Sequence, residues 1–80
     1  MNIAIIGLGY VGLPLAIEFG KKYNTVGYDK SEIKIDKYNL GIDPNGEVDS
    51  KEFFDAKLLK FTKNPDIIKI ADIIIIAVPT

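Results

Sequence analysis

Three glycines near the start of the chain have the spacing of a phosphate-binding turn. Gly7, Gly9 and Gly12 lie between an apolar run at residues 2–7 and a helix-like segment at 10–23. In such a turn the first glycine permits a sharp bend, the second lets a pyrophosphate approach the backbone, and the third lets the helix pack closely on the sheet. The N–H groups at the start of the helix then face the phosphates. The spacing predicts a dinucleotide site, although a tight strand–helix turn without a ligand has the same pattern.

An acidic residue at the end of the next predicted strand supports the dinucleotide interpretation. Asp29 closes the strand-like segment at 25–29, 17 residues after Gly12. The acid that binds the adenosine ribose belongs at about this distance. A carboxylate there accepts hydrogen bonds from the ribose hydroxyls and repels a 2′-phosphate, which favours NAD over NADP. Lys30 and Lys34 are nearby cations that could pair with a 2′-phosphate and so favour NADP, but with both considered NAD is the predicted cofactor.

Two further residues have positions that suit contact with a cofactor. Tyr10 lies between the second and third glycines, where it either covers the pyrophosphate or packs as a partly exposed aromatic side chain. Thr80 closes the segment "VPT" at 78–80, after the last predicted strand. Strand ends at this edge of a parallel sheet line the ligand crevice, so its hydroxyl is expected near the nicotinamide-side ribose. The alternative is that 78–80 only terminates the strand.

Strand and helix patterns alternate along the chain. Apolar runs predict strands at 2–7, 25–29, 60–62 and 72–80, the last of them buried. Helix patterns cover 10–23, 31–39 behind a Ser31 cap, 50–57 behind a Ser50 cap, and 64–71. In the first helix, Val11, Leu15 and Phe19 form the predicted apolar stripe, with Leu13 and Ala16 near the same side. The alternation predicts an α/β fold with a parallel sheet and flanking helices.

Eighty residues allow one small domain. We expect residues 1–80 to be the N-terminal part of a Rossmann-type dinucleotide-binding domain, truncated after about four strands, because doubly wound sheets normally continue further. The last strand is then expected to present an open edge and uncovered sheet faces, which favours instability or association.

The composition excludes several classes of function within these residues. The chain has neither cysteine nor histidine, which excludes a disulfide framework, a Cys-type zinc site and His-based catalysis. No carboxylate pair stands out, so we assign no catalytic and no metal-binding residue. Ten basic and eleven acidic residues give a formal charge of −1, without a footprint for nucleic acid. No signal peptide is visible and the apolar run at 73–79 is too short to span a bilayer, so we expect a cytoplasmic protein without a membrane partner.

Taken in order, several stretches resemble the start of the UDP-glucose/GDP-mannose dehydrogenase family. The resemblance is greatest to its UDP-N-acetylhexosamine 6-dehydrogenases (UDP-GlcNAc/UDP-GalNAc) of the Vi-polysaccharide and O-antigen type. It runs through "IAIIGLGYVGLPLAIEFGKKY", "VGYD", "NLGID", "LKFT" and "ADIIIIAVPT". "GLGYVGLP" together with the terminal "VPT" is more specific than the three glycines alone.

The resemblance implies a twofold NAD-dependent oxidation of the C6 alcohol of a UDP-sugar to a carboxylate, for surface polysaccharide. It implies that Tyr10 and Val11 meet the pyrophosphate through backbone N–H groups and that Asp29 holds the adenosine ribose. Lys34 falls where the family commonly has Arg beside that ribose, and Thr80 matches a threonine near the cofactor. The family's nucleophilic Cys, catalytic Lys and sugar-binding residues lie beyond position 80. The chain alone is therefore expected to be inactive, as part of a homodimeric enzyme that binds its UDP-sugar through residues outside this chain.

Two other functions share this fold start. A regulatory NAD-sensing module needs the same glycines and acid without a catalytic half, but "YVGLP" and "VPT" are not expected in it. A hydroxyacid or phosphogluconate-type dehydrogenase is the second alternative, for which "GYVGLPLA" and the "GID" loop are not expected. The fold alone does not separate these functions.

Overall fold

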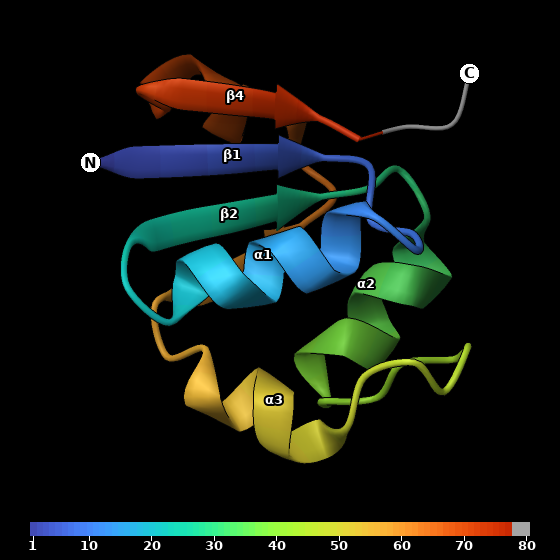
Figure 1. Ribbon diagram of the computed structural model, residues 1–80. Coiled ribbons are helices and arrows are strands. Elements are labelled where there is room, and N and C mark those ends of the chain that lie inside the picture. Colours follow the sequence, from blue (N-terminus) through green and yellow to red (C-terminus); the bar gives the residue numbers. More distant parts are fainter. Residues whose placement is uncertain (78–80) are drawn as a thin grey trace.

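The computed structural model describes residues 1–77, which form a four-stranded sheet with helices packed on it (Figure 1). The strand order is β3-β2-β1-β4 and all three pairings are parallel, which confirms the predicted α/β class. The elements are β1 (Asn2–Ile6), α1 (Gly12–Gly20), β2 (Asn24–Tyr28), α2 (Glu32–Asn39), α3 (Ser50–Asp55), β3 (Leu59–Thr62), the 3₁₀ helix η1 (Pro65–Ile70) and β4 (Ile73–Ile76).

The strand order places a topological switch point at β1. From β1 the chain continues to β2 on one side and to β3 beyond it, and then crosses over to β4 on the other side of β1. In open parallel sheets, ligands bind outside the carboxyl ends of the strands where the order reverses. The carboxyl end of β1, which leads into the glycine-rich turn, is therefore the place where this fold is expected to hold a ligand.

The hydrophobic core lies between the sheet and the helices on one of its faces. Figure 1 shows α1 beside β2, with α2 and α3 on the same side. Side chains alternate between the two faces of a strand, so Ile3 and Ile5 of β1 share the core face, where they are 3% and 0% exposed. The buried cluster consists of Ile3, Ile5, Leu8, Leu13, Ala16, Ile17, Ile35, Tyr38 and Ala56.

Helix α1 differs from its prediction in both length and orientation. It covers Gly12–Gly20 rather than 10–23. Val11 is its N-cap residue and is 63% exposed, while Leu15 and Phe19 are only partly buried, so these three residues do not form the centre of the buried face. Leu13 and Ala16, which were predicted near the same side, are buried as expected. The residues that α1 buries are Gly12, Leu13, Ala16, Ile17 and Gly20.

The glycines at the two ends of α1 explain which face it buries. A Cβ at Gly20 would lie 2.5 Å from the Cβ of Leu59, and a Cβ at Gly12 would overlap the carbonyl oxygen of Gly7. The helix therefore lies on the sheet with its glycine-lined face, where the backbones approach most closely. Apolar spacing alone does not reveal this face, because glycine contributes nothing to a hydrophobic stripe.

Helix α2 begins and ends as predicted. The Ser31 hydroxyl accepts a hydrogen bond from the N–H of Lys34 at 3.3 Å. At the other end Gly41 has φ +74°, and its N–H donates to the carbonyl of Tyr38 at 2.9 Å. The N–H of Ile42 donates to the carbonyl of Lys37 at 2.9 Å, which completes a glycine-terminated helix end.

The Ser50 cap predicted for the next helix is wrong. Asp49 is the N-cap residue of α3, and the helix ends at Asp55 rather than near Lys57. Ser50 is already helical, and its hydroxyl donates to the carbonyl of Gly41 at 3.0 Å. The serine thus ties α3 to the end of α2 instead of capping its own helix.

Strand β4 is shorter and more exposed than the predicted buried strand at 72–80. It lies at the edge of the sheet, where Ile74 and Ile76 are 47% and 71% exposed. Within the described residues the prediction that this strand is buried is therefore wrong, whereas the expected open edge of the sheet is confirmed.

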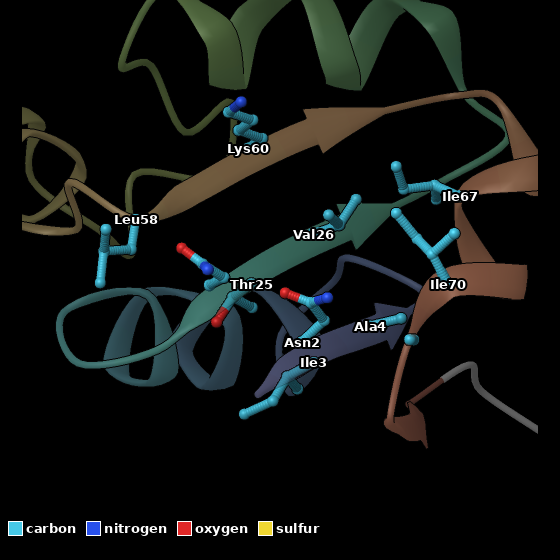
Figure 2. Close-up of a pocket in the computed structure, with 11 residues that line it drawn as sticks. Asn2, Ile3, Ala4, Thr25, Val26, Leu58, Lys60, Ile67 and Ile70 are labelled. Atoms are coloured by element: carbon cyan, nitrogen blue, oxygen red, sulfur yellow. The ribbon is translucent and has the colours of Figure 1, made fainter.

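The 3₁₀ helix η1 packs on the sheet face opposite α1, and Figure 2 shows Ile67 and Ile70 beside that face. None of the helices described in residues 1–77 has the length and hydropathy needed to cross a membrane.

Candidate functional site

Two glycines fix the turn between β1 and α1. Gly7 has φ +93°, a conformation that L side chains rarely adopt, and its N–H donates to the carbonyl of Tyr28 at 2.9 Å. Gly12 lies against this bend, because a Cβ there would overlap the Gly7 carbonyl oxygen and lie 3.3 Å from the Cβ of Ala77. The turn therefore needs glycine at both positions for its own geometry, as the spacing predicts.

Gly9 differs from its two neighbours because the space around it is open. Apart from its two neighbours in the chain, no described residue has an atom within 4 Å of a Cβ placed at Gly9. Tyr10 and Val11 follow at the start of α1 and are 72% and 63% exposed. In the described chain, the first turn of α1 carries no acidic residue and its N-cap side chain makes no hydrogen bond. The positive end of the helix dipole is thus accessible to an anion.

Asp29 joins the glycine-rich turn to the start of α2. Its Oδ2 accepts the N–H of Leu8 at 3.0 Å, and its Oδ1 accepts the N–H of Ser31 at 2.9 Å. The Nζ of Lys34 lies 4.0 Å from Oδ2, and the Asp29 side chain is 13% exposed. Because each carboxylate oxygen accepts up to two hydrogen bonds, Asp29 keeps capacity for the hydroxyls of a ligand.

A cavity of about 410 Å³ opens at the carboxyl ends of β1 and β2, next to Asp29. This volume falls in the range of small-molecule sites. The cavity wall carries one carboxylate and two ammonium groups, together with the backbone of the glycine-rich turn. Its lining residues are Ile6, Gly7, Leu8, Gly9, Tyr28, Asp29, Lys30 and Lys34.

Tyr38 of α2 contributes to the site, although it belongs to none of the motifs that the sequence analysis identified. Its side chain is 2% exposed, and its hydroxyl donates to the carbonyl of Leu8 at 3.0 Å. Burial, and then the charges of Asp43 and Asp29, raise the pKa of Tyr38 to about 12, so the hydroxyl remains a donor at neutral pH. The signal that the sequence offered was the three-residue spacing of Ile35 and Tyr38, which places both on one face of the predicted helix. Its bond to the turn required the fold, because 30 residues separate the two partners.

A second cavity of about 290 Å³ lies on the sheet face opposite α1 (Figure 2). Its walls come from the first halves of β1 and β2 and from η1, and they include Ala4, Val26, Ile67 and Ile70. Lys60 is the charged residue in its lining. This cavity holds none of the residues predicted to bind a cofactor, and its apolar wall is one face of the open sheet.

The structure brings most of the predicted site residues together at one end of the sheet. Gly7, Gly9, Tyr10, Val11 and Gly12 form the turn and the start of α1, and Asp29 and Lys34 lie beside it. Thr80 lies outside the described residues, so its predicted position is not compared with the structure. Among residues 1–77, no group of three or more His, Cys, Asp and Glu side chains is placed to hold a metal ion.

Comparisons with known proteins connect this arrangement to one family. The family profile "UDP-glucose/GDP-mannose dehydrogenase family, NAD binding domain" matches residues 1–80. UDP-N-acetyl-D-glucosamine 6-dehydrogenase of Salmonella typhi is 49% identical and that of Pseudomonas aeruginosa 45% identical, each over the whole chain and 19% of the relative. The solved UDP-D-ManNAc dehydrogenase of Pyrococcus horikoshii superposes with a TM-score of 0.79 at 40% identity, over 98% of this chain and 20% of that one.

NAD is the cofactor of the matched domain, and the residues described above fit it. The open backbone at Gly9 and the accessible start of α1 suit a pyrophosphate. The Asp29 carboxylate, held beside the turn, suits a ribose diol. The chain spans about a fifth of the length of the relatives it matches.

Proposed function

This chain belongs to the UDP-glucose/GDP-mannose dehydrogenase family, and we propose that it supplies the NAD-binding site of a longer UDP-sugar 6-dehydrogenase. The observation that carries the proposal is the meeting of the glycine-rich turn and Asp29 at the switch point of the sheet. NAD, when bound, accepts a hydride from an alcohol carbon. The role of these residues is to hold the cofactor and fix its orientation. Residues 1–80 form the N-terminal part of one Rossmann-type domain.

Each predicted site residue has a separate task in this proposal. The open backbone at Gly9 and the N–H groups of Tyr10 and Val11 receive the pyrophosphate, supported by the start of α1. Asp29 accepts the hydroxyls of the adenosine ribose, and Lys34 lies beside it at 4.0 Å. Gly7 and Gly12 keep the turn tight. Thr80 is assigned to the nicotinamide-side ribose from the family resemblance.

The proposed reaction is the twofold oxidation of the C6 alcohol of a UDP-N-acetylhexosamine to a carboxylate. Two relatives that align with the entire chain are named UDP-N-acetyl-D-glucosamine 6-dehydrogenase, which supports this substrate class. The 80 residues contain neither cysteine nor histidine. The UDP-sugar and the catalytic groups are therefore assigned to residues outside this chain, in a protein that we propose to be a cytoplasmic homodimer.

Asp29 provides the test of the NAD site. Calorimetric titration of the full-length protein that carries this chain is expected to give tighter binding of NAD than of NADP. Asp29→Ala should weaken NAD binding about tenfold or more, since hydrogen bonds to a charged group are lost. The variant should also reduce the difference in affinity between NAD and NADP, because the repulsion of the 2′-phosphate disappears while Lys30 and Lys34 remain.

The ratio of the two affinities is the control in this experiment. Asp29 also anchors the N–H of Leu8, so the variant disturbs the turn as well as the ribose contact. NAD and NADP share the pyrophosphate, and a disturbed turn therefore weakens both equally. Tighter binding of NADP by the wild-type protein, or an unchanged ratio in Asp29→Ala, would contradict the assignment.

A further inference from the structure

Both polar backbone groups of Leu8 are held by side chains from the second strand–helix unit. Its N–H donates to Asp29 at 3.0 Å, and its carbonyl accepts from the Tyr38 hydroxyl at 3.0 Å. The Leu8 side chain is 1% exposed, and its methyl groups lie 3.0 and 3.1 Å from where a Cβ of Gly27 would be. Leu8 is the residue between the first two glycines, so the middle of the turn is anchored at three points.

The hydrogen bond from Tyr38 to the Leu8 carbonyl also determines the direction of the Gly9 N–H, because the two groups belong to one peptide. In a planar trans peptide the C=O of one residue and the N–H of the next point in opposite directions. No peptide bond in residues 1–77 is cis. The hydrogen bond from Tyr38 draws the Leu8 carbonyl toward the core, and the N–H of Gly9 in the same plane is consequently turned away from the core. The space around a Cβ placed at Gly9 is also open.

The preceding peptide plane is consistent with this geometry. The N–H of Leu8 points to Asp29, so the carbonyl of Gly7 points the opposite way. That carbonyl is the group that a Cβ at Gly12 would overlap. The peptide planes on both sides of Leu8 are thus fixed, one between Asp29 and α1 and the other by Tyr38.

We propose that Tyr38 is a positioning residue of the cofactor site, which fixes the Leu8–Gly9 peptide so that the Gly9 N–H faces the pyrophosphate and the Leu8 carbonyl does not. The inference rests on the proposed NAD site and adds a residue to it. A carbonyl oxygen turned toward a pyrophosphate would repel it, whereas an N–H donates to it. Tyr38 therefore acts through the backbone of the turn and does not itself touch the cofactor.

The test compares Tyr38→Phe with Phe53→Leu in the full-length protein. The first variant removes only the hydroxyl. The second disturbs the same aromatic cluster, in which the rings of Tyr38 and Phe53 lie 6.1 Å apart, but it leaves the Tyr38 hydroxyl in place. Titration with NAD should give about a fivefold or larger rise in Kd for Tyr38→Phe, because a smaller fraction of the protein has the binding-competent turn. Phe53→Leu should stay within about twofold of wild type, even where its melting temperature falls further.

Hydrogen exchange gives a second readout that a general loss of packing would not reproduce. Tyr38→Phe should speed exchange in the peptide that covers the turn at 7–12 while leaving the β1 amides protected. The inference is overturned if Tyr38→Phe binds NAD within twofold of wild type, or if Phe53→Leu weakens NAD as much. Failure of the wild-type protein to bind NAD would overturn the proposed function itself, which distinguishes the two results.

Discussion

Alanine at Gly9 and at Gly12 should separate the binding role of the glycine-rich turn from its folding role. At Gly12 a Cβ would overlap the Gly7 carbonyl oxygen and lie 2.9 Å from the Gly7 carbonyl carbon, and both are backbone atoms. A side chain could turn aside, but here the turn or α1 must move. Gly12→Ala is therefore expected to lower the free energy of unfolding by about 3 kcal/mol, at the upper end of overpacking costs.

Gly9→Ala should have the opposite profile. The φ angle of Gly9 is not positive, and no described residue other than its two chain neighbours has an atom within 4 Å of the added Cβ. Its stability should equal that of the wild type or exceed it by up to about 1 kcal/mol, since alanine restricts the unfolded chain. The same methyl group occupies the space assigned to the pyrophosphate, so Kd for NAD should rise about tenfold or more, equivalent to about 1.4 kcal/mol.

Thermal denaturation and NAD titration of both full-length variants decide between these expectations. The reasoning predicts that the stability loss occurs in Gly12→Ala and that Gly9→Ala loses binding while it remains folded. Two results would refute it. Gly9→Ala could bind NAD with wild-type affinity, which would remove the close approach of the cofactor. Its melting temperature could also be as low as that of Gly12→Ala, which would mean that the turn needs a glycine at position 9 in order to fold.

Two further predictions concern stability away from the cofactor. Gly41→Ala forces an L side chain into φ +74° at the end of α2 and should lower the free energy of unfolding by about 1 kcal/mol; an unchanged denaturant midpoint would contradict this. The hydrogen bond from Lys21 lowers the pKa of Glu52 below 4.5. A lowered folded-state pKa contributes stability above the unfolded value, which is lost as the pH falls through the folded value. Glu52→Gln should therefore show a flatter dependence of stability on pH below about pH 5, and an unchanged slope would rule out this contribution.

The site could largely be predicted from the sequence because its determinants are local. Gly7 and Gly12 are required by the bend itself, and Asp29 follows at the end of the very next strand. Each was recognisable by residue type and spacing. Tyr38 was not recognised as part of the site, because a buried tyrosine has the same pattern whether its hydroxyl bonds to the turn or to any other backbone group.

The errors in the predicted fold arise where packing, not pattern, decides. The buried face of α1 is set by the close approach of Gly12 and Gly20 to the sheet, which a search for apolar spacing does not detect. The run of isoleucines at 73–76 has the composition of a buried strand, yet β4 lies at the sheet edge in the described structure. An apolar composition indicates that a strand is suited to burial, but whether it is buried depends on which other parts of the chain pack against it.

The polar anchors of the turn come from the first two strand–helix units. Gly7 bonds to the end of β2, and Leu8 bonds to Asp29 and to Tyr38 of α2. These partners are separated by 21 to 30 residues along the chain. The hydrogen bonds that anchor the glycine-rich turn therefore come from β1 to α2. By contrast, the exposed isoleucines of β4 lie at the edge of the sheet and make none of the hydrogen bonds that anchor the turn. Changes on the outer face of β4 should accordingly alter stability or association well before they alter the affinity for NAD.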